Sequence, residues 1–147
     1  MASNNFSYKI DNIELTEFIF RTHGVIEKNS KFDVHFDIKV NNRISSVNSL
    51  IIQNIIIDIF MTNSNEHLAG ISLFIGFKID DFEKNIKFDK KTSLYDIISE
   101  LESLITNISL GTCRGILYSR LQGTYLSNAI LPVLSNTLIK KNVTTGD

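Results

Sequence analysis

The spacing of apolar residues changes once along this chain, and that change restricts the possible folds more than any other feature. In the first half apolar side chains recur at every second position, as in Phe32, Val34, Phe36, Ile38 and Val40. From residue 92 they recur at every third or fourth position, as in Leu94, Ile97, Ile98, Leu101, Leu104 and Ile105. A period of two is typical of strands with one wet face, and the longer period is typical of helices. The pattern therefore predicts strands first and helices last.

Four strands are predicted, over residues 6–22, 32–40, 50–61 and 69–79. Residues 50–61 are apolar in both phases, which favours an interior strand or one covered on both faces. The turn-rich segment 62–67 predicts a hairpin between the third and fourth strands. In the first strand the apolar phase shifts between Ile10 and Ile13 and again between Leu15 and Phe18, which indicates bulges or a bend.

The helical part is predicted to begin at Ser93, as an N-cap, with Asp96 in the first turn. A second stripe follows, on the same helix or on a separate one: Leu110, Cys113, Ile116, Leu117 and Leu121. We expect Gly123 to end it and Pro132 to begin a short last helix. Four antiparallel strands followed by C-terminal helices packed on one sheet face form an α+β fold. Because no linker or repeat is visible, residues 1–147 are predicted to form a single domain.

Composition argues against several classes of protein. The 147 residues are 43% hydrophobic and 21% charged, as in ordinary globular domains. A net charge of −1 without a cluster of Lys or Arg argues against nucleic acid as a partner. The single cysteine allows no internal disulfide, which favours a reducing compartment. No signal peptide is visible, and no apolar run is long enough to span a bilayer. We therefore expect a cytoplasmic protein without membrane insertion.

The sequence contains no motif that predicts catalysis. Asp33, His35 and Asp37 share one strand face and could ligate a metal, yet such neighbours lie about 6.8 Å apart along a strand. A solvated face is the preferred interpretation, so no metal is predicted. Cys113 lies in the apolar helical stripe and is expected to be a buried structural thiol. We therefore predict no enzyme, no catalytic residues and no cofactor.

Gly111 and Gly115 are four residues apart, so on a helix they leave a bare patch. Glycine costs about 1 kcal/mol relative to alanine inside a helix. A patch that lets another backbone approach closely would offset this cost, whereas the simpler alternative is local relief of crowding. We predict that the two glycines belong to an oligomer interface.

Residues 107–139 resemble the C-terminal half of the SecB export-chaperone family. Asn107 and Arg114 keep the spacing of two family residues, and Gly123 and Tyr125 stand near its glycine–aromatic turn. The last family segment is matched by Leu131, Pro132, Val133 and Leu138. The opening "FSYKIDNIEL" is similar to the family's first strand. Leu110-Gly111-Thr112 replaces the family's Phe-Pro-Tyr.

The resemblance implies an ATP-independent holdase that binds unfolded or precursor polypeptides in apolar grooves, in protein export or elsewhere. It also implies a homotetramer built as a dimer of dimers, while a homodimer remains open. The groove is predicted where the last helix meets the second strand, with Phe32, Val34, Ile130, Leu131, Val133 and Leu134 as candidates. The alternative, that these residues are simply core, stays open, above all for Phe32 and Val34. The family's acidic tail, which is thought to meet the SecA motor, is replaced by "KKNVTTGD", so SecA stays an open partner.

Two other classes of protein are compatible with the residues. One is a dedicated adaptor that binds a single partner, such as an antitoxin-type client, and the sequence does not separate it from a general chaperone. The other is a hotdog-like thioesterase, which also combines a long helix with an antiparallel sheet. In that fold the helix normally precedes most strands, so the order seen in this chain argues against it.

Overall fold

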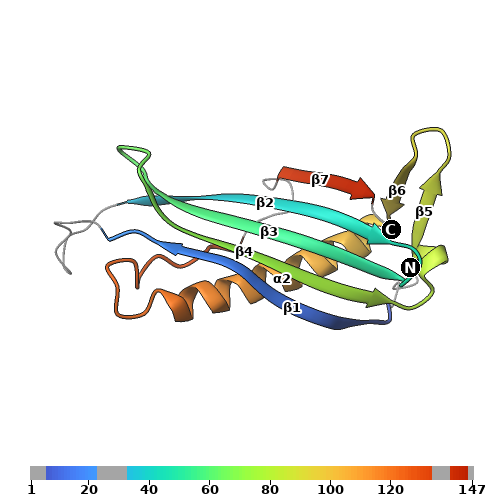
Figure 1. Ribbon diagram of the computed structural model, residues 1–147, viewed down its shortest axis with the longest axis horizontal. Coiled ribbons are helices and arrows are strands. Elements are labelled where there is room, and N and C mark those ends of the chain that lie inside the picture. Colours follow the sequence, from blue (N-terminus) through green and yellow to red (C-terminus); the bar gives the residue numbers. More distant parts are fainter. Residues whose placement is uncertain (1–5, 23–32, 134–139, 146–147) are drawn as a thin grey trace.

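The computed structural model describes residues 6–22, 33–133 and 140–145, the last group by its backbone alone. The elements in chain order are β1 (Tyr8–Phe20), β2 (Val34–Ser45), β3 (Leu50–Met61), β4 (His67–Ile79), α1 (Phe82–Asn85), β5 (Ile86–Asp89), β6 (Leu94–Ile97), α2 (Ser99–Arg120) and β7 (Lys140–Thr145). Figure 1 shows the long strands forming one twisted sheet with α2 running behind it. The predicted order of four long strands followed by helix is confirmed.

The main sheet has the strand order β1-β4-β3-β2-β7. Its first four strands are antiparallel, and β3 and β4 form the predicted hairpin. β1 lies beside β4 rather than beside β2, so β4 and β3 separate the consecutive strands β1 and β2, as in a Greek key. β7 pairs in parallel with β2, from Lys39↔Lys140 to Ile44↔Thr145. This fifth strand was not predicted because its sequence, KKNVTT, shows no apolar alternation.

β1 contains the predicted irregularities. Its pairing with β4 shifts register between Ile10 and Asn12 and again between Leu15 and Glu17. Each extra residue returns the apolar side chains to the face that α2 covers, because side chains alternate strictly between faces in a regular strand. The phase shifts in the sequence are therefore two bulges.

The start of the helix was predicted wrongly. Leu94 and Ile97 lie in β6, which pairs with β5 in a separate two-stranded sheet. Ser93 has a φ of 56° in the turn between these strands, and Asp96 pairs with Lys87, so neither residue caps a helix. Residue 98 is the N-cap, and α2 then continues without interruption to Arg120. The spacing of Leu94 and Ile97 fits a helix, but cross-strand contacts such as the 5.0 Å ring pair of Phe88 and Tyr95 accompany the hairpin.

The end of α2 agrees with the prediction, since Leu121 is its C-cap and Gly123 follows with a φ of 78°. The short helix predicted from Pro132 is absent from the described residues. Residues 131–133 have no regular structure, residues 134–139 lie outside the described part of the chain, and Lys140–Thr145 is a strand. No helix in the described segments has the length and apolar content needed to cross a membrane.

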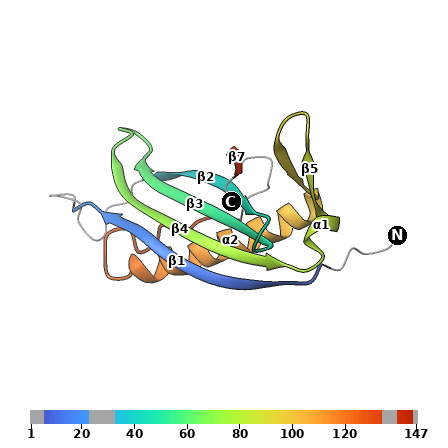
Figure 2. The same ribbon diagram turned by 45° about the vertical axis from the view of Figure 1, so that its right-hand side comes forward.

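One face of the sheet packs on α2 in two apolar clusters. The cluster near the helix start includes Ile44, Ile51, Phe77, Leu101 and Ile105. The cluster near the helix end includes Ile38, Val40, Ile55, Leu73, Leu110, Cys113 and Leu117. Between them lies a fully buried polar group made by Asn42, Gln53, Thr106 and Ser109. α2 thus covers only one side of the sheet, as the turned view in Figure 2 shows.

The other face of the sheet is not covered by any described element, and we call it the open face. β3 is an interior strand, as predicted, but its residues alternate between buried and half-buried. The apolar character of both phases therefore reflects one core face and one partly accessible face.

Candidate functional site

The segment that follows α2 folds back under the sheet and completes the core. Leu121, Leu126 and Leu131 are at most 2% exposed and belong to the same cluster as Ile38 and Val40 of β2. α2 itself packs on β3 and β4. The returning segment therefore adds apolar cover beside the part of β2 that contains Ile38 and Val40.

Arg114 of α2 fixes the returning segment. Its Nε donates a 2.7 Å hydrogen bond to the carbonyl of Leu131, and its Nη2 donates a 3.2 Å bond to the carbonyl of Pro132. Hydrogen bonds from a charged donor are stronger than neutral ones. Nearer the helix, the Tyr125 hydroxyl donates a 2.5 Å bond to the carbonyl of Arg21, and its ring lies 5.2 Å from that of Phe20. Burial and the nearby Glu66 carboxylate raise the pKa of Tyr125, which keeps this donor protonated.

Apolar side chains remain accessible on the returning segment and on two strands whose residues pack on the same cluster. Ile130 is 55% exposed and Val133 is 88% exposed, although both flank the buried Leu131. Val34, Phe36 and Met61, from β2 and β3, are half-buried against the same cluster. We call these five residues the apolar rim. Burial of such side chains by another chain contributes about 25 cal/mol per Å².

The six predicted groove residues differ in their exposure in the structure. Ile130 and Val133 are exposed and Val34 is half-buried, so these three are accessible. Leu131 is only 2% exposed and lies in the core, so its placement in a groove is wrong for the chain on its own. The reason is that Arg114 holds the Leu131 carbonyl while the side chain packs into the cluster. Phe32 and Leu134 lie outside the described residues.

A second accessible surface runs between α2 and β1. It is a groove of about 450 Å³ lined by Ile13, Leu15, Leu73, Gly115, Ile116, Ser119 and Arg120. A Cβ atom added to Gly115 would meet no atom within 4 Å, and one added to Gly111 would meet only the Arg114 Nη1, at 3.9 Å. Neither glycine is therefore required by close packing inside this chain. We call this surface the glycine groove.

Cys113 and His35, which were considered for catalysis or metal binding, both have surroundings that explain them as structural residues. Burial raises the pKa of the Cys113 thiol to about 12, so it stays protonated at neutral pH. His35 stacks on Phe60 with ring centroids 5.4 Å apart. Within the described ranges, no three His, Cys, Asp or Glu side chains are grouped as a metal site would require.

His67 forms two side-chain hydrogen bonds that the sequence did not reveal. Arg21 Nε donates a 3.1 Å bond to His67 Nδ1, so His67 Nε2 carries the proton that it donates to Asp58 Oδ1 at 2.8 Å. Gly70 makes room for this arrangement, since a Cβ there would lie 2.6 Å from Asp58 Oδ1. The side chains of Arg21, His67 and Asp58 thus connect the residue that follows β1 with β4 and β3.

Comparison with known proteins identifies the fold. No family model matches the chain, and no curated protein sequence matches it. Among solved structures, the chain is similar to a SecB-like chaperone of Mycobacterium tuberculosis, solved in complex with a ChAD peptide from the HigA1 antitoxin. The match has a TM-score of 0.62 and 13% sequence identity, and it covers 86% of this chain and 90% of that one. The protein therefore has the fold of a SecB-like chaperone, as the resemblance in its sequence implied.

Proposed function

We propose that this protein is an ATP-independent holdase that binds unfolded or precursor polypeptides at the apolar rim. The observation that carries the proposal is the exposure of Ile130 and Val133 on a backbone that Arg114 holds in place. Apolar residues on a fixed segment can bind a client without first losing the conformational freedom of a loose loop. Accessible apolar patches of this kind mark interaction sites. The proposal assigns binding rather than catalysis.

A dedicated adaptor is the second candidate function. Its support is the solved SecB-like chaperone, whose bound peptide comes from an antitoxin. A general holdase and an adaptor would use the same apolar rim but differ in the number of clients. Affinity purification from the native host separates them, because a holdase recovers many unfolded proteins and an adaptor recovers one partner.

The proposed assembly is a homodimer or homotetramer formed through the glycine groove, with Gly111 and Gly115 at the contact. The accessible groove and the empty space at Gly115 support this proposal. The proposed location is the cytoplasm. Direct binding to purified SecA, measured by calorimetry, would place the chaperone in protein export.

The holdase is tested with a chemically denatured client whose aggregation is followed by light scattering. The variant Ile130→Asp/Val133→Asp should lose most of the suppression seen with wild-type protein, because charged groups resist burial against an apolar client. Val47→Asp is the matched control, since Val47 is 82% exposed in the turn between β2 and β3. The proposal is wrong if wild-type protein does not delay aggregation, or if Val47→Asp is equally damaging.

A further inference from the structure

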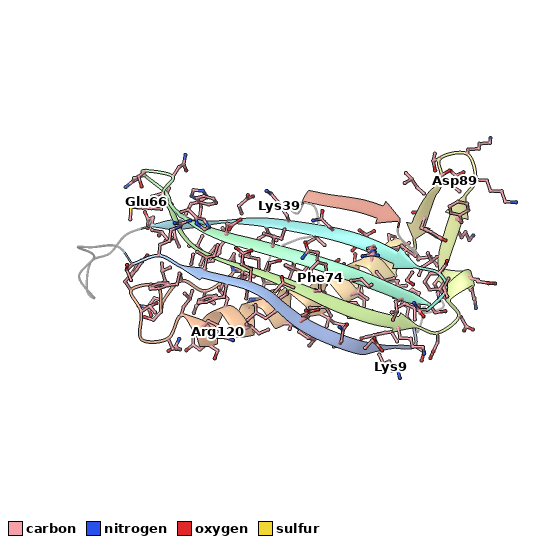
Figure 3. The ribbon with its side chains drawn as sticks, viewed as in Figure 1. Lys9, Lys39, Glu66, Phe74, Asp89 and Arg120 are labelled. Atoms are coloured by element: carbon pink, nitrogen blue, oxygen red, sulfur yellow. The ribbon has the colours of Figure 1, made fainter. Side chains whose placement is uncertain are left out.

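The outer edge of β2 is paired along only about half of its length. β7 pairs in parallel with residues 39–44 of β2, and no strand in the described part of the chain pairs with the outer edge of residues 34–38. Figure 3 labels Lys39 on β2, beside the start of β7. The unpaired half contains Val34 and Phe36 of the apolar rim. Because an unpaired strand edge presents main-chain donors and acceptors, the rim is continuous with an edge that can accept another extended chain.

The residues of β7 fit their register positions poorly. Lys140 stands beside Lys39, so two residues of like charge are paired, which destabilises a sheet. Lys141 stands beside Val40, which is fully buried on the face that α2 covers. Lysine is almost never fully buried without a partner, and parallel pairing is slightly less stable per residue than antiparallel pairing. β7 is therefore a weakly held strand on this edge.

We propose that the β2 edge binds an extended segment of another polypeptide as a strand, and that β7 occupies part of this edge until such a segment displaces it. The incoming strand runs in the direction of β7, first along residues 34–38 and then along residues 39–44 in place of β7. Main-chain hydrogen bonds to β2 supply affinity, and side chains at alternate positions supply specificity. The inference rests on the proposed function, because the partner is a polypeptide that also contacts the apolar rim.

The chemistry of the partner follows from the two faces of β2. Buried apolar residues recur on the face that α2 covers: Ile38, Val40 and Ile44. A partner strand beside them gains most from apolar residues at every second position. The charged residues of this part of β2 lie on the open face, with Asp37 half-buried and Lys39 and Arg43 exposed. Since cross-strand pairs of opposite charge stabilise a sheet, the partner carries a basic residue beside Asp37 and acidic residues beside Lys39 and Arg43.

Binding of a fluorescently labelled peptide tests the site. The probe is Val-Thr-Val-Lys-Val-Glu-Val-Thr-Val-Glu-Val, which follows this pattern along residues 34–44 in the direction of β7. The control peptide has the same sequence with Lys and Glu exchanged, so that it places like charges beside each charged residue of the edge. Fluorescence anisotropy with the full-length protein should show binding about tenfold weaker for the control peptide than for the probe.

Two variants change the pairing of β7 in opposite directions. Asn142→Pro/Val143→Pro removes two consecutive main-chain N–H groups, and one of them must point towards β2 because neighbouring residues of a strand point to opposite sides. The probe should then bind about tenfold more tightly, since β7 no longer competes for the edge. Lys140→Glu/Lys141→Val corrects both mismatches of β7 and should weaken binding of the probe about tenfold.

Hydrogen exchange locates the probe on the wild-type chain. With saturating probe, the amides of residues 140–145 should lose protection, while those of residues 39–44 stay protected by the incoming strand. A probe that binds without exposing residues 140–145 is bound elsewhere, and the proposal is then wrong. This measurement needs no variant, so it decides the question even if the proline variant does not fold.

The proposal is also wrong if the proline variant binds the probe no better than wild type does. Dimers of that variant without tighter probe binding would mean that the edge accepts a second copy instead. A wild-type chain that binds the probe as expected but does not delay client aggregation would contradict the holdase function and support this site. A chain that delays aggregation without binding the probe would support the holdase function and contradict this site.

Discussion

Replacing Gln53 with leucine should destabilise the protein by removing the polar group between its two apolar clusters. Gln53 is fully buried, and its Nε2 donates to Asn42 Oδ1 at 2.9 Å and to Thr106 Oγ1 at 3.0 Å. Its Oε1 accepts a 2.6 Å bond from the Ser109 hydroxyl. One side chain thus connects β2, β3 and α2.

The magnitude follows from what the substitution leaves behind. The Asn42 Oδ1 loses the donor at Gln53, which costs about 1–3 kcal/mol for a buried acceptor. The hydroxyls of Thr106 and Ser109 can turn to helix carbonyls, so their loss is about 1 kcal/mol each. Burial of the leucine side chain returns about 1–2 kcal/mol. The expected net loss in the free energy of unfolding is about 2–3 kcal/mol.

Urea denaturation followed by circular dichroism, at one fixed protein concentration, measures this loss. The midpoint should fall by about 1–2 M for a slope of about 1.5–2 kcal/mol per M. Ser109→Ala should cost about 1 kcal/mol, and the double variant should cost less than the sum, because both changes remove the same bond. Asn107→Ala, at an exposed position of α2 outside the glycine groove, is the control and should change little. A Gln53→Leu variant as stable as wild type would refute the reasoning.

Three further predictions concern individual residues. Leu131→Asp should lower the free energy of unfolding by more than about 3 kcal/mol, whereas Val133→Asp should change it by less than about 0.5 kcal/mol; equal changes in thermal denaturation would contradict the assignment of Leu131 to the core. Gly115→Leu should reduce the size of the assembly in light scattering while leaving each chain folded, since the added side chain enters open space in the glycine groove; an unchanged assembly would exclude this interface. Burial raises the pKa of Cys113 from 9.0 to about 12, so the thiol of the unfolded chain loses its proton first. The free energy of unfolding should therefore fall as pH rises from 9 towards 12. Cys113→Ala should remove this pH dependence in urea titrations, and an unchanged pH dependence would show that Cys113 does not cause it.

The sequence predicted the elements whose apolar period is long and regular. Alternation placed the four long strands, and the two phase shifts in the first strand matched its bulges. The stripe from Leu110 to Leu121 predicted a helix, and the structure shows one continuous α2. These features depend on local spacing, which a single sequence displays directly.

Elements that depend on pairing between distant residues were missed. β7 is held to β2 by parallel main-chain pairing, which leaves no apolar pattern in its residues. Leu94 and Ile97 have helical spacing, but the partners of β6 in β5 decide its conformation.

Leu131 was predicted as groove because it stands where the last helix was expected to meet the second strand. Only its packing into the core cluster shows that it points inward while Ile130 and Val133 stay exposed. Arg114 itself was noted only for its spacing, although a basic residue within an apolar helical stripe could have suggested its hydrogen bond to the Leu131 carbonyl.

α2 connects the buried polar group with the apolar rim, because residues of this one helix hold both in place. Ser109 and Thr106 fix the position of the helix on Gln53, and Arg114 lies five residues beyond Ser109, about 7.5 Å along the axis. A displacement of α2 by a single residue would move Arg114 by about 1.5 Å, enough to break its 2.7 Å bond to the Leu131 carbonyl. Gln53→Leu should therefore weaken the suppression of client aggregation at temperatures where the variant is still folded. Full suppression by folded Gln53→Leu protein would show that the rim does not depend on the position of the helix.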